Sequence, residues 1–223
     1  MHNKDIMLDK ILDIRNFTTS YKILWFYALY KEIINKKKEV SIKKLAARMV
    51  SISYELIICH NINFGKQDKL KDIVFYLHSK LGIDKDESED YICGYIMGSK
   101  DEKLNEMITK LVKYVPYRLI RPFYDDLIRE KEDKIGKKIS DAQINNYIYE
   151  LNNSEYDIDS LYKIDKESKK IEFSESWIEY IICKKDKVKD LIDNTLISYL
   201  KNKNPNINQI KSEIYLNKEK LIN

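Results

Sequence analysis

Tyr21-Lys-Ile-Leu-Trp-Phe-Tyr-Ala-Leu-Tyr30 is apolar at almost every position. A helix that is apolar on all of its faces is buried, because each face needs a neighbour to keep it from water. We therefore expect this segment to form the central helix of a bundle. Thr18, Thr19 and Ser20 directly precede it, and each is a candidate N-cap, since such side chains accept hydrogen bonds from the first amides of a helix.

Amphipathic helices are predicted further along the chain. Apolar residues recur there at the three- and four-residue spacing that places them on one face of a helix, in segments 70–81, 104–112, 144–151 and 188–200. A further helix with less regular spacing is predicted from Ser41 to about Cys59. Two segments follow residues that match a capping box, Ser99 with Glu102 and Ser140 with Gln143. The sequence thus predicts a mainly α protein.

One stretch departs from the helical pattern. Leu161–Ile164 and Ile171–Phe173 flank a polar connection and predict a small β-hairpin near residues 161–173. Ser174 is a candidate N-cap for a helix after it. The polar stretch Asn152–Asp159 is the best candidate boundary. We therefore expect a helical bundle in residues 1–152 and a hairpin plus helices in residues 153–223, packed together as one compact unit.

The composition favours a folded protein outside the membrane. Of 223 residues, 43% are hydrophobic, and only five are Gly and three Pro, which indicates long helices rather than disorder. Met1–Lys10 mixes charged with apolar residues and lacks the apolar run of a signal peptide. The apolar run Ile23–Tyr30 is too short to cross a bilayer. We expect a cytoplasmic protein with no membrane partner.

Residues for catalysis or metal binding do not form a familiar pattern. The three cysteines, Cys59, Cys93 and Cys183, are far apart, and His60 and His78 lack the spacing of metal ligands. The sequence contains none of the usual phosphate loops and no serine nucleophile elbow. We therefore expect no catalytic residue, no metal and no cofactor. An enzyme that assembles its site from dispersed carboxylates is the remaining alternative.

Basic clusters are the best candidates for binding, although the net charge is only +4, from 40 Lys and Arg against 36 Asp and Glu. Such side chains can neutralise phosphates of a nucleic acid. The candidate nucleic-acid-binding residues are Lys43, Lys44, Arg48, Arg118, Arg121, Lys184 and Lys185. Two alternatives stay open: the lysines serve solubility, or Arg118 pairs with Asp125 or Asp126.

Ser41–Met49 also has the character of the first helix of a helix-turn-helix. Val50–Ile58, which follows, contains no glycine turn and no polar recognition helix. The helix-turn-helix is therefore the weaker interpretation of this segment.

Several phrases resemble the N-terminal region of a family of prokaryotic HNH-domain endonucleases associated with restriction and phage defence. Taken in chain order, the phrases are Asn16-Phe-Thr-Thr-Ser-Tyr-Lys-Ile-Leu-Trp25, Lys44-Leu-Ala-Ala-Arg-Met49, Asn61-Ile-Asn-Phe-Gly-Lys-Gln-Asp-Lys-Leu70, Val115-Pro-Tyr-Arg-Leu-Ile-Arg-Pro-Phe123, Trp177-Ile-Glu-Tyr180 and Tyr199-Leu-Lys-Asn-Lys-Asn-Pro-Asn206. In that family the nuclease domain, with its metal-binding His and Asn residues, follows the Asn-Pro-Asn phrase. This sequence holds no histidine after His78. The resemblance therefore implies the helical part of such a nuclease without its catalytic domain.

Two functions follow as hypotheses. The first is a non-catalytic module that binds nucleic acid, DNA in the first place, in a restriction or phage-defence system. The second is a protein-interaction subunit, an adaptor, inhibitor or decoy that acts on a separately encoded nuclease or other effector. A homo-oligomer is compatible with both.

Overall fold

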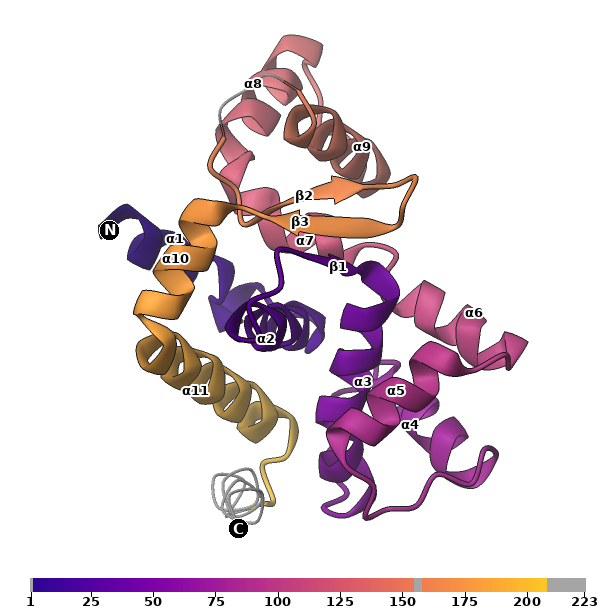
Figure 1. Ribbon diagram of the computed structural model, residues 1–223. Coiled ribbons are helices and arrows are strands. Elements are labelled where there is room, and N and C mark those ends of the chain that lie inside the picture. Colours follow the sequence, from indigo (N-terminus) through magenta and orange to yellow (C-terminus); the bar gives the residue numbers. More distant parts are fainter. Residues whose placement is uncertain (1, 155–157, 208–223) are drawn as a thin grey trace.

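Helices make up most of the chain, and a small antiparallel sheet joins them (Figure 1). The computed structural model describes residues 2–154 and 158–207. The first half contains α1 (His2–Ile11), η1 (Ile14–Asn16), α2 (Tyr21–Ile34), β1 (Glu39–Ser41), α3 (Ile42–Ile58), α4 (Leu70–Ser79), α5 (Glu89–Gly98) and α6 (Glu102–Leu111). The second half contains α7 (Val115–Ile120), η2 (Arg121–Phe123), α8 (Asp125–Ile135), α9 (Asp141–Asn152), β2 (Tyr162–Asp165), β3 (Lys170–Phe173), α10 (Glu175–Cys183) and α11 (Lys185–Lys203).

The central helix of the fold is α2, as its apolar sequence predicts. Residues Ile23–Leu29 are all buried, and Trp25 has no exposed surface. Helices α3, α7, α10 and α11 pack against it from different sides. Figure 1 shows α2 in the middle of the molecule, with α11 below it and the sheet above. The predicted buried position of this segment is confirmed.

Helix α3 connects α2 to a second group of helices. It packs against α2, α4, α5 and α6, and most of its side chains from Leu45 to Ile57 are buried. The helix continues without a break through Ile58. The helix-turn-helix interpretation is therefore wrong, because the residues that would form its turn lie inside one helix.

The sheet contains one strand more than the predicted hairpin. Strands β2 and β3 confirm the hairpin, and β1 pairs with β3 in antiparallel register, so the order is β1-β3-β2. Val40 lies opposite Ile171. Because β1 has only three residues, it carries no alternating pattern long enough to be recognised in the sequence. Its partner strand β3, which is about 130 residues later in the chain, supplies the hydrogen bonds of the pair.

The helix caps agree with the sequence in part. Ser140 and Gln143 form the predicted capping box of α9. The prediction for Ser99 is wrong, because Asp101 caps α6 and accepts a hydrogen bond from the Leu104 amide. Ser20 and Ser174 occupy N-cap positions, but neither side chain caps its helix. Both hydroxyls instead donate to carboxylates of other segments, Asp68 and Asp159.

Hydrogen bonds connect the segments on either side of the expected boundary near residue 152. The buried Asn152 amide donates to Tyr124 Oη and to the carbonyl of Tyr162. The hydroxyl of Tyr162 donates to the carbonyl of Pro116 at 2.6 Å and accepts from Trp25 Nε1 at 3.1 Å. The hairpin is thus bonded to α2 and α7 as well as to β1. Among the described residues, no helix is both long and apolar enough to cross a membrane.

Candidate functional site

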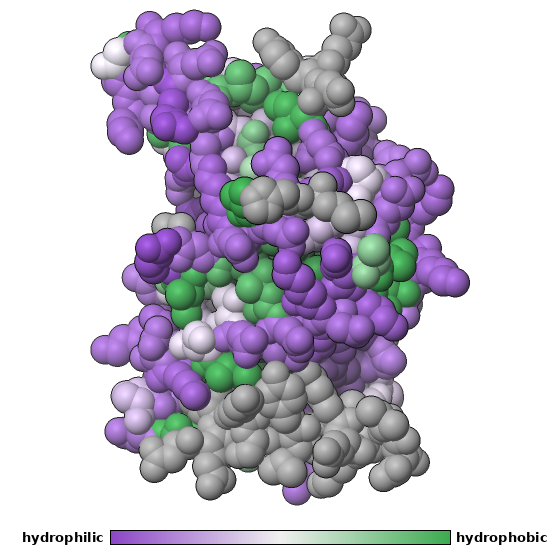
Figure 2. Space-filling model, turned by 90° about the vertical axis from the view of Figure 1, so that its left-hand side faces the viewer, coloured by the Kyte–Doolittle hydropathy of each residue, from purple (hydrophilic) through white to green (hydrophobic). Residues whose placement is uncertain are grey.

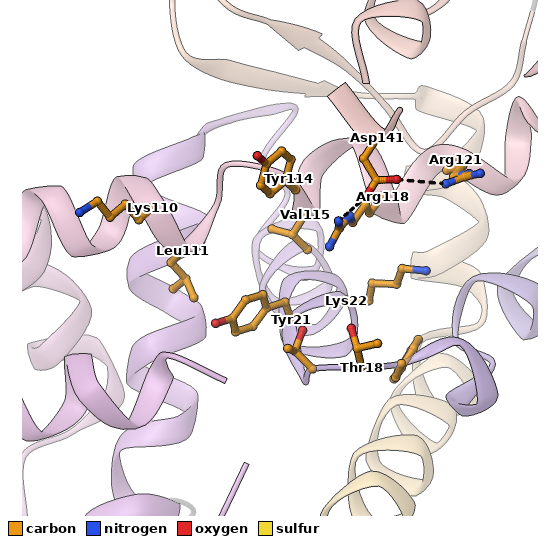
Figure 3. A pocket seen from close by; sticks show the side chains of 12 residues that line it. Thr18, Tyr21, Lys22, Lys110, Leu111, Tyr114, Val115, Arg118, Arg121 and Asp141 are labelled. Atoms are coloured by element: carbon orange, nitrogen blue, oxygen red, sulfur yellow. Dashed lines mark hydrogen bonds and ion pairs between the residues drawn. The ribbon is translucent and has the colours of Figure 1, made fainter. Parts of the chain in front are cut away.

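A pocket of about 320 Å³ opens at the N-terminal end of α2 (Figure 3). Five segments supply its lining: the residues before α2, the first turn of α2, the end of α6, α7 with the residues on either side of it, and the first residue of α9. The lining residues are Phe17, Thr18, Thr19, Tyr21, Lys22, Lys110, Leu111, Tyr114, Val115, Arg118, Arg121 and Asp141. Residues far apart in the sequence therefore meet at one concave surface.

The pocket is rich in positive charge. Its lining includes Lys22, Lys110, Arg118 and Arg121, and the one carboxylate among these lining residues is Asp141. Lys110 is paired with Glu106 on its own helix, so Lys22, Arg118 and Arg121 are the cations that give the pocket its positive charge. An anion is the ligand that such a surface attracts.

Asp141 holds one arginine firmly and the other loosely. Arg118 Nη2 donates to Asp141 Oδ2 at 2.6 Å, and the Arg118 guanidinium lies 5.1 Å from the centre of the Tyr114 ring. Arg121 lies 3.8 Å from Asp141 and 3.9 Å from Asp125, which is beyond hydrogen-bond distance. Both guanidinium groups therefore keep donors that a ligand can use, and Tyr114 and Asp141 keep Arg118 in position.

Lys22 lies close to the two arginines of the pocket. Burial lowers the pKa of its half-buried ammonium group, and the nearby charges of Arg118 and Arg121 lower it further, against a smaller opposite effect of Asp125. Like charges disfavour each other's charged form. A bound anion would relieve that repulsion. Figure 3 shows Lys22, Arg118 and Arg121 on the same side of the pocket.

The segment before α4 holds the start of α2 in place. Asp68 is buried and accepts hydrogen bonds from the amide and the hydroxyl of Ser20 and from the amide of Leu70. The hydroxyl of Tyr21 accepts from the amide of Lys69 at 2.7 Å. Burial raises the pKa of Asp68, and its three hydrogen bonds oppose that rise. The geometry of the pocket floor thus depends on a carboxylate outside the pocket.

Three of the phrases quoted in the sequence analysis also meet in this region. Besides the contacts of Ser20 and Tyr21, the side chain of Asn204 bonds to both the amide and the carbonyl of Asn63. The hydroxyl of Tyr199 donates to the carbonyl of Phe64 at 2.7 Å. The phrases around residues 16–25, 61–70 and 199–206 are therefore in direct contact, and the phrase around 115–123 lines the same pocket.

The candidates on α3 face the protein rather than the solvent. Arg48 is only 7% exposed, and it pairs with Glu32 at 3.3 Å and with Asp90 at 2.5 Å. Lys43 Nζ donates to the carbonyl of Met97, at the end of α5. The half-buried Lys44 lies beside Cys93 of α5. These three side chains contact α5 and do not line the pocket.

Lys184 and Lys185 lie at the junction between α10 and α11. Lys185 is exposed and Lys184 is half-buried, and neither lines the pocket. The carbonyl of Lys185 accepts a hydrogen bond from Tyr30 Oη. Of the seven candidates from the sequence, the pocket brings together only Arg118 and Arg121.

Two cations of the pocket were missed in the sequence. Lys22 is the single charged residue in the apolar stretch 21–30, and this exception was the signal that could have identified it. Lys110 is one of several lysines on or near α6, so nothing in the sequence distinguishes it. In the described part of the chain, no group of three or more His, Cys, Asp or Glu side chains is arranged to hold a metal ion.

Comparisons with known proteins add no relative: no family model, no curated protein and no solved structure matches this chain.

Proposed function

We propose that the protein binds nucleic acid through the pocket at the start of α2, with DNA as the leading candidate. We also propose that it does so without catalysing a reaction. The observation that carries the proposal is the convergence of Lys22, Arg118 and Arg121 on one concave surface. Phosphate groups are the anions that repeat along a nucleic acid, and protein contacts to them supply most of the affinity that does not depend on sequence.

The two arginines suit a phosphate group better than a single positive charge would. A guanidinium group offers five N–H donors in a planar fork that can give two parallel hydrogen bonds to one phosphate. Arg118 uses one donor for Asp141, and Arg121 makes only long ion pairs. The hydroxyls of Thr18 and Thr19, which line the same pocket, are further donors for a phosphate oxygen.

The family resemblance adds a biological setting to this proposal. Two of its phrases, around residues 16–25 and 115–123, supply most of the residues that line the pocket. The resemblance and the pocket fit the same role. In that role the protein is a helical module that binds DNA for a separately encoded nuclease, in restriction or phage defence. Arg48 is left out of the proposed contacts because Glu32 and Asp90 already bind it.

The test is a binding titration with a labelled DNA duplex at roughly 50 and 200 mM salt. We expect binding that weakens with salt, and Arg121→Ala is expected to weaken it about tenfold, because a charge-assisted hydrogen bond is lost. The salt slope should fall by about one unit. The matched control is Arg129→Ala, since Arg129 is an exposed arginine that pairs with Asp126 away from the pocket. Absent binding at low salt, or equal losses in both variants, rejects the proposal.

The rival function, a protein-interaction subunit, finds less support. The large apolar side chains exposed in the described part of the chain lie on or beside different helices: Ile6, Phe75, Tyr91, Tyr114, Ile135 and Ile182. Interaction surfaces usually present a contiguous apolar patch. Figure 2 shows the face with α1, α10 and α11, where hydrophilic side chains separate the apolar areas from one another.

A further inference from the structure

We infer that the pocket takes a phosphate monoester, the terminal phosphate of a nucleic-acid strand or of a free nucleotide, rather than an internal phosphodiester of a duplex. This inference rests on the proposed function, because it specifies which phosphate the same site recognises. Three independent features of the pocket support it: its shape, its charge and the helix end beneath it.

The shape of the pocket limits what can enter. Side chains from α2, α6, α7 and α9 surround a volume of about 320 Å³, which is at the lower end of the range for sites that bind small molecules. A phosphate inside a strand has a sugar on both sides. Such a phosphate could enter only if the pocket also admitted both sugars. A terminal phosphate can enter with a single sugar behind it. The concave surface therefore favours a chain end.

The charge of the pocket exceeds what one phosphodiester needs. Lys22, Arg118 and Arg121 converge, and the carboxylate of Asp141 binds Arg118. The other carboxylate near Arg121, that of Asp125 at 3.9 Å, is already paired with Lys10 at 2.9 Å. A phosphodiester carries one negative charge, whereas a phosphate monoester carries nearly two at neutral pH. The second charge is attracted by the same fixed cations without any additional reorganisation of the protein. The excess of cations thus matches a monoester.

The N-terminal end of α2 also favours a bound anion. Its first turn lines the pocket through Tyr21 and Lys22, and Figure 3 shows these side chains and Thr18 arranged around the helix seen end-on. The side chain that would ordinarily cap this turn is that of Ser20, but its hydroxyl donates to Asp68 instead. The first turn of this 14-residue helix therefore has no cap from its own N-cap side chain, and Asp68 takes up only the amide and hydroxyl of Ser20. A helix N-terminus attracts anions.

The experiment compares one oligonucleotide in three forms: with a 5′-phosphate, with a 3′-phosphate and with hydroxyl groups at both ends. We expect at least one phosphorylated form to bind about tenfold more tightly than the hydroxyl form, which is the gain of a further charge-assisted hydrogen bond. Lys22→Met and Arg121→Ala should each abolish this difference, and Arg129→Ala should preserve it. Lys22→Met keeps an unbranched side chain of similar length, so the helix start should stay folded. Far-UV circular dichroism of each variant checks that the fold is retained.

Competition with AMP and with adenosine distinguishes the two sources of the monoester. Displacement of the oligonucleotide by AMP but not by adenosine assigns the site to a nucleotide, and failure of both with a retained end preference assigns it to a strand end. Equal binding of the three forms, still sensitive to Arg121→Ala, overturns the inference and leaves the proposed function standing. If no form binds at low salt while AMP still binds wild type and not Arg121→Ala, the proposed function fails and the monoester site remains. If none of these ligands binds, both fail.

Discussion

Arg48 and Arg121 are the same amino acid in opposite surroundings. Arg48 is 7% exposed and bonded to Glu32, which is 4% exposed, and to the exposed Asp90. Arg121 keeps 40% of its side chain exposed, and its carboxylate partners lie beyond hydrogen-bond distance. The first arginine neutralises a carboxylate of the protein itself. The second keeps N–H donors accessible at the edge of a pocket.

Arg48→Met is expected to destabilise the protein by roughly 3 kcal/mol, because the substitution leaves the Glu32 carboxylate buried without its partner. The measurement is chemical denaturation of the variant and wild type. DNA binding of the folded variant should equal that of wild type. A variant with unchanged stability and lost DNA binding would show that Arg48 contacts phosphate after all. Arg129→Ala serves as the surface control, since exposed ion pairs contribute little.

At the scale of elements, one carboxylate joins the starts of two helices. Asp68 bonds to Ser20 at the start of α2 and to Leu70 at the start of α4. Because Ser20 is used in this way, its side chain does not cap α2, and Tyr21 and Lys22 of the first turn line the pocket. The same hydrogen bonds therefore position the elements and shape the candidate site.

The stability conferred by Asp68 should depend on pH. Burial is the largest cause of its raised pKa, so the folded state binds the proton more tightly than the unfolded state. The contribution of Asp68 is then greatest below its ordinary pKa near 3.8 and falls as the pH rises through the folded value. Asp68→Asn cannot titrate, so the difference in unfolding free energy between variant and wild type should change as the pH rises above about 4. Denaturation at a series of pH values measures it, and a constant difference would contradict the assignment.

At the scale of the whole molecule, distant segments are tied together on both sides of residue 152. Strand β1 pairs with β3, α10 and α11 pack on α2, and Tyr162 links Trp25 to Pro116. The hairpin and the last helices therefore share the core of the helices before them. We expect the described chain to unfold as one cooperative unit.

The two tryptophans of the chain allow a direct test, since Trp25 lies in α2 and Trp177 in α10, and both are buried. Trp177→Phe leaves Trp25 as the fluorescent reporter, and Trp25→Phe leaves Trp177. In each variant the fluorescence midpoint in urea should coincide with the midpoint from far-UV circular dichroism, as two-state unfolding requires. Comparison within each variant removes the effect of the substitution on stability. A fluorescence midpoint that departs from the circular dichroism midpoint would indicate two units that unfold separately.

Features set by neighbours in the chain could be predicted from the sequence. The apolar stretch at residues 21–30, the four amphipathic stripes and the hairpin near 161–173 all appear in the structure. The Ser140–Gln143 capping box forms as expected. Each of these depends on spacing over a few residues, because helix and strand periodicity place side chains on one face whatever the rest of the chain does. Arg118 and Arg121 are three residues apart in a segment that contains Pro116 and Pro122, so they could be selected from the sequence for the same reason.

Only the tertiary structure decided which residues became partners. It paired β1 with β3 and brought Lys22 next to Arg118. It also placed Arg48 in ion pairs with Glu32 and Asp90. None of these contacts has a local signature, since each joins segments separated by many residues of chain. Burial and charge at a position depend on what packs there, and packing is determined by the whole set of apolar faces at once. Spacing along the chain thus determined the helices, and packing determined where their charges point.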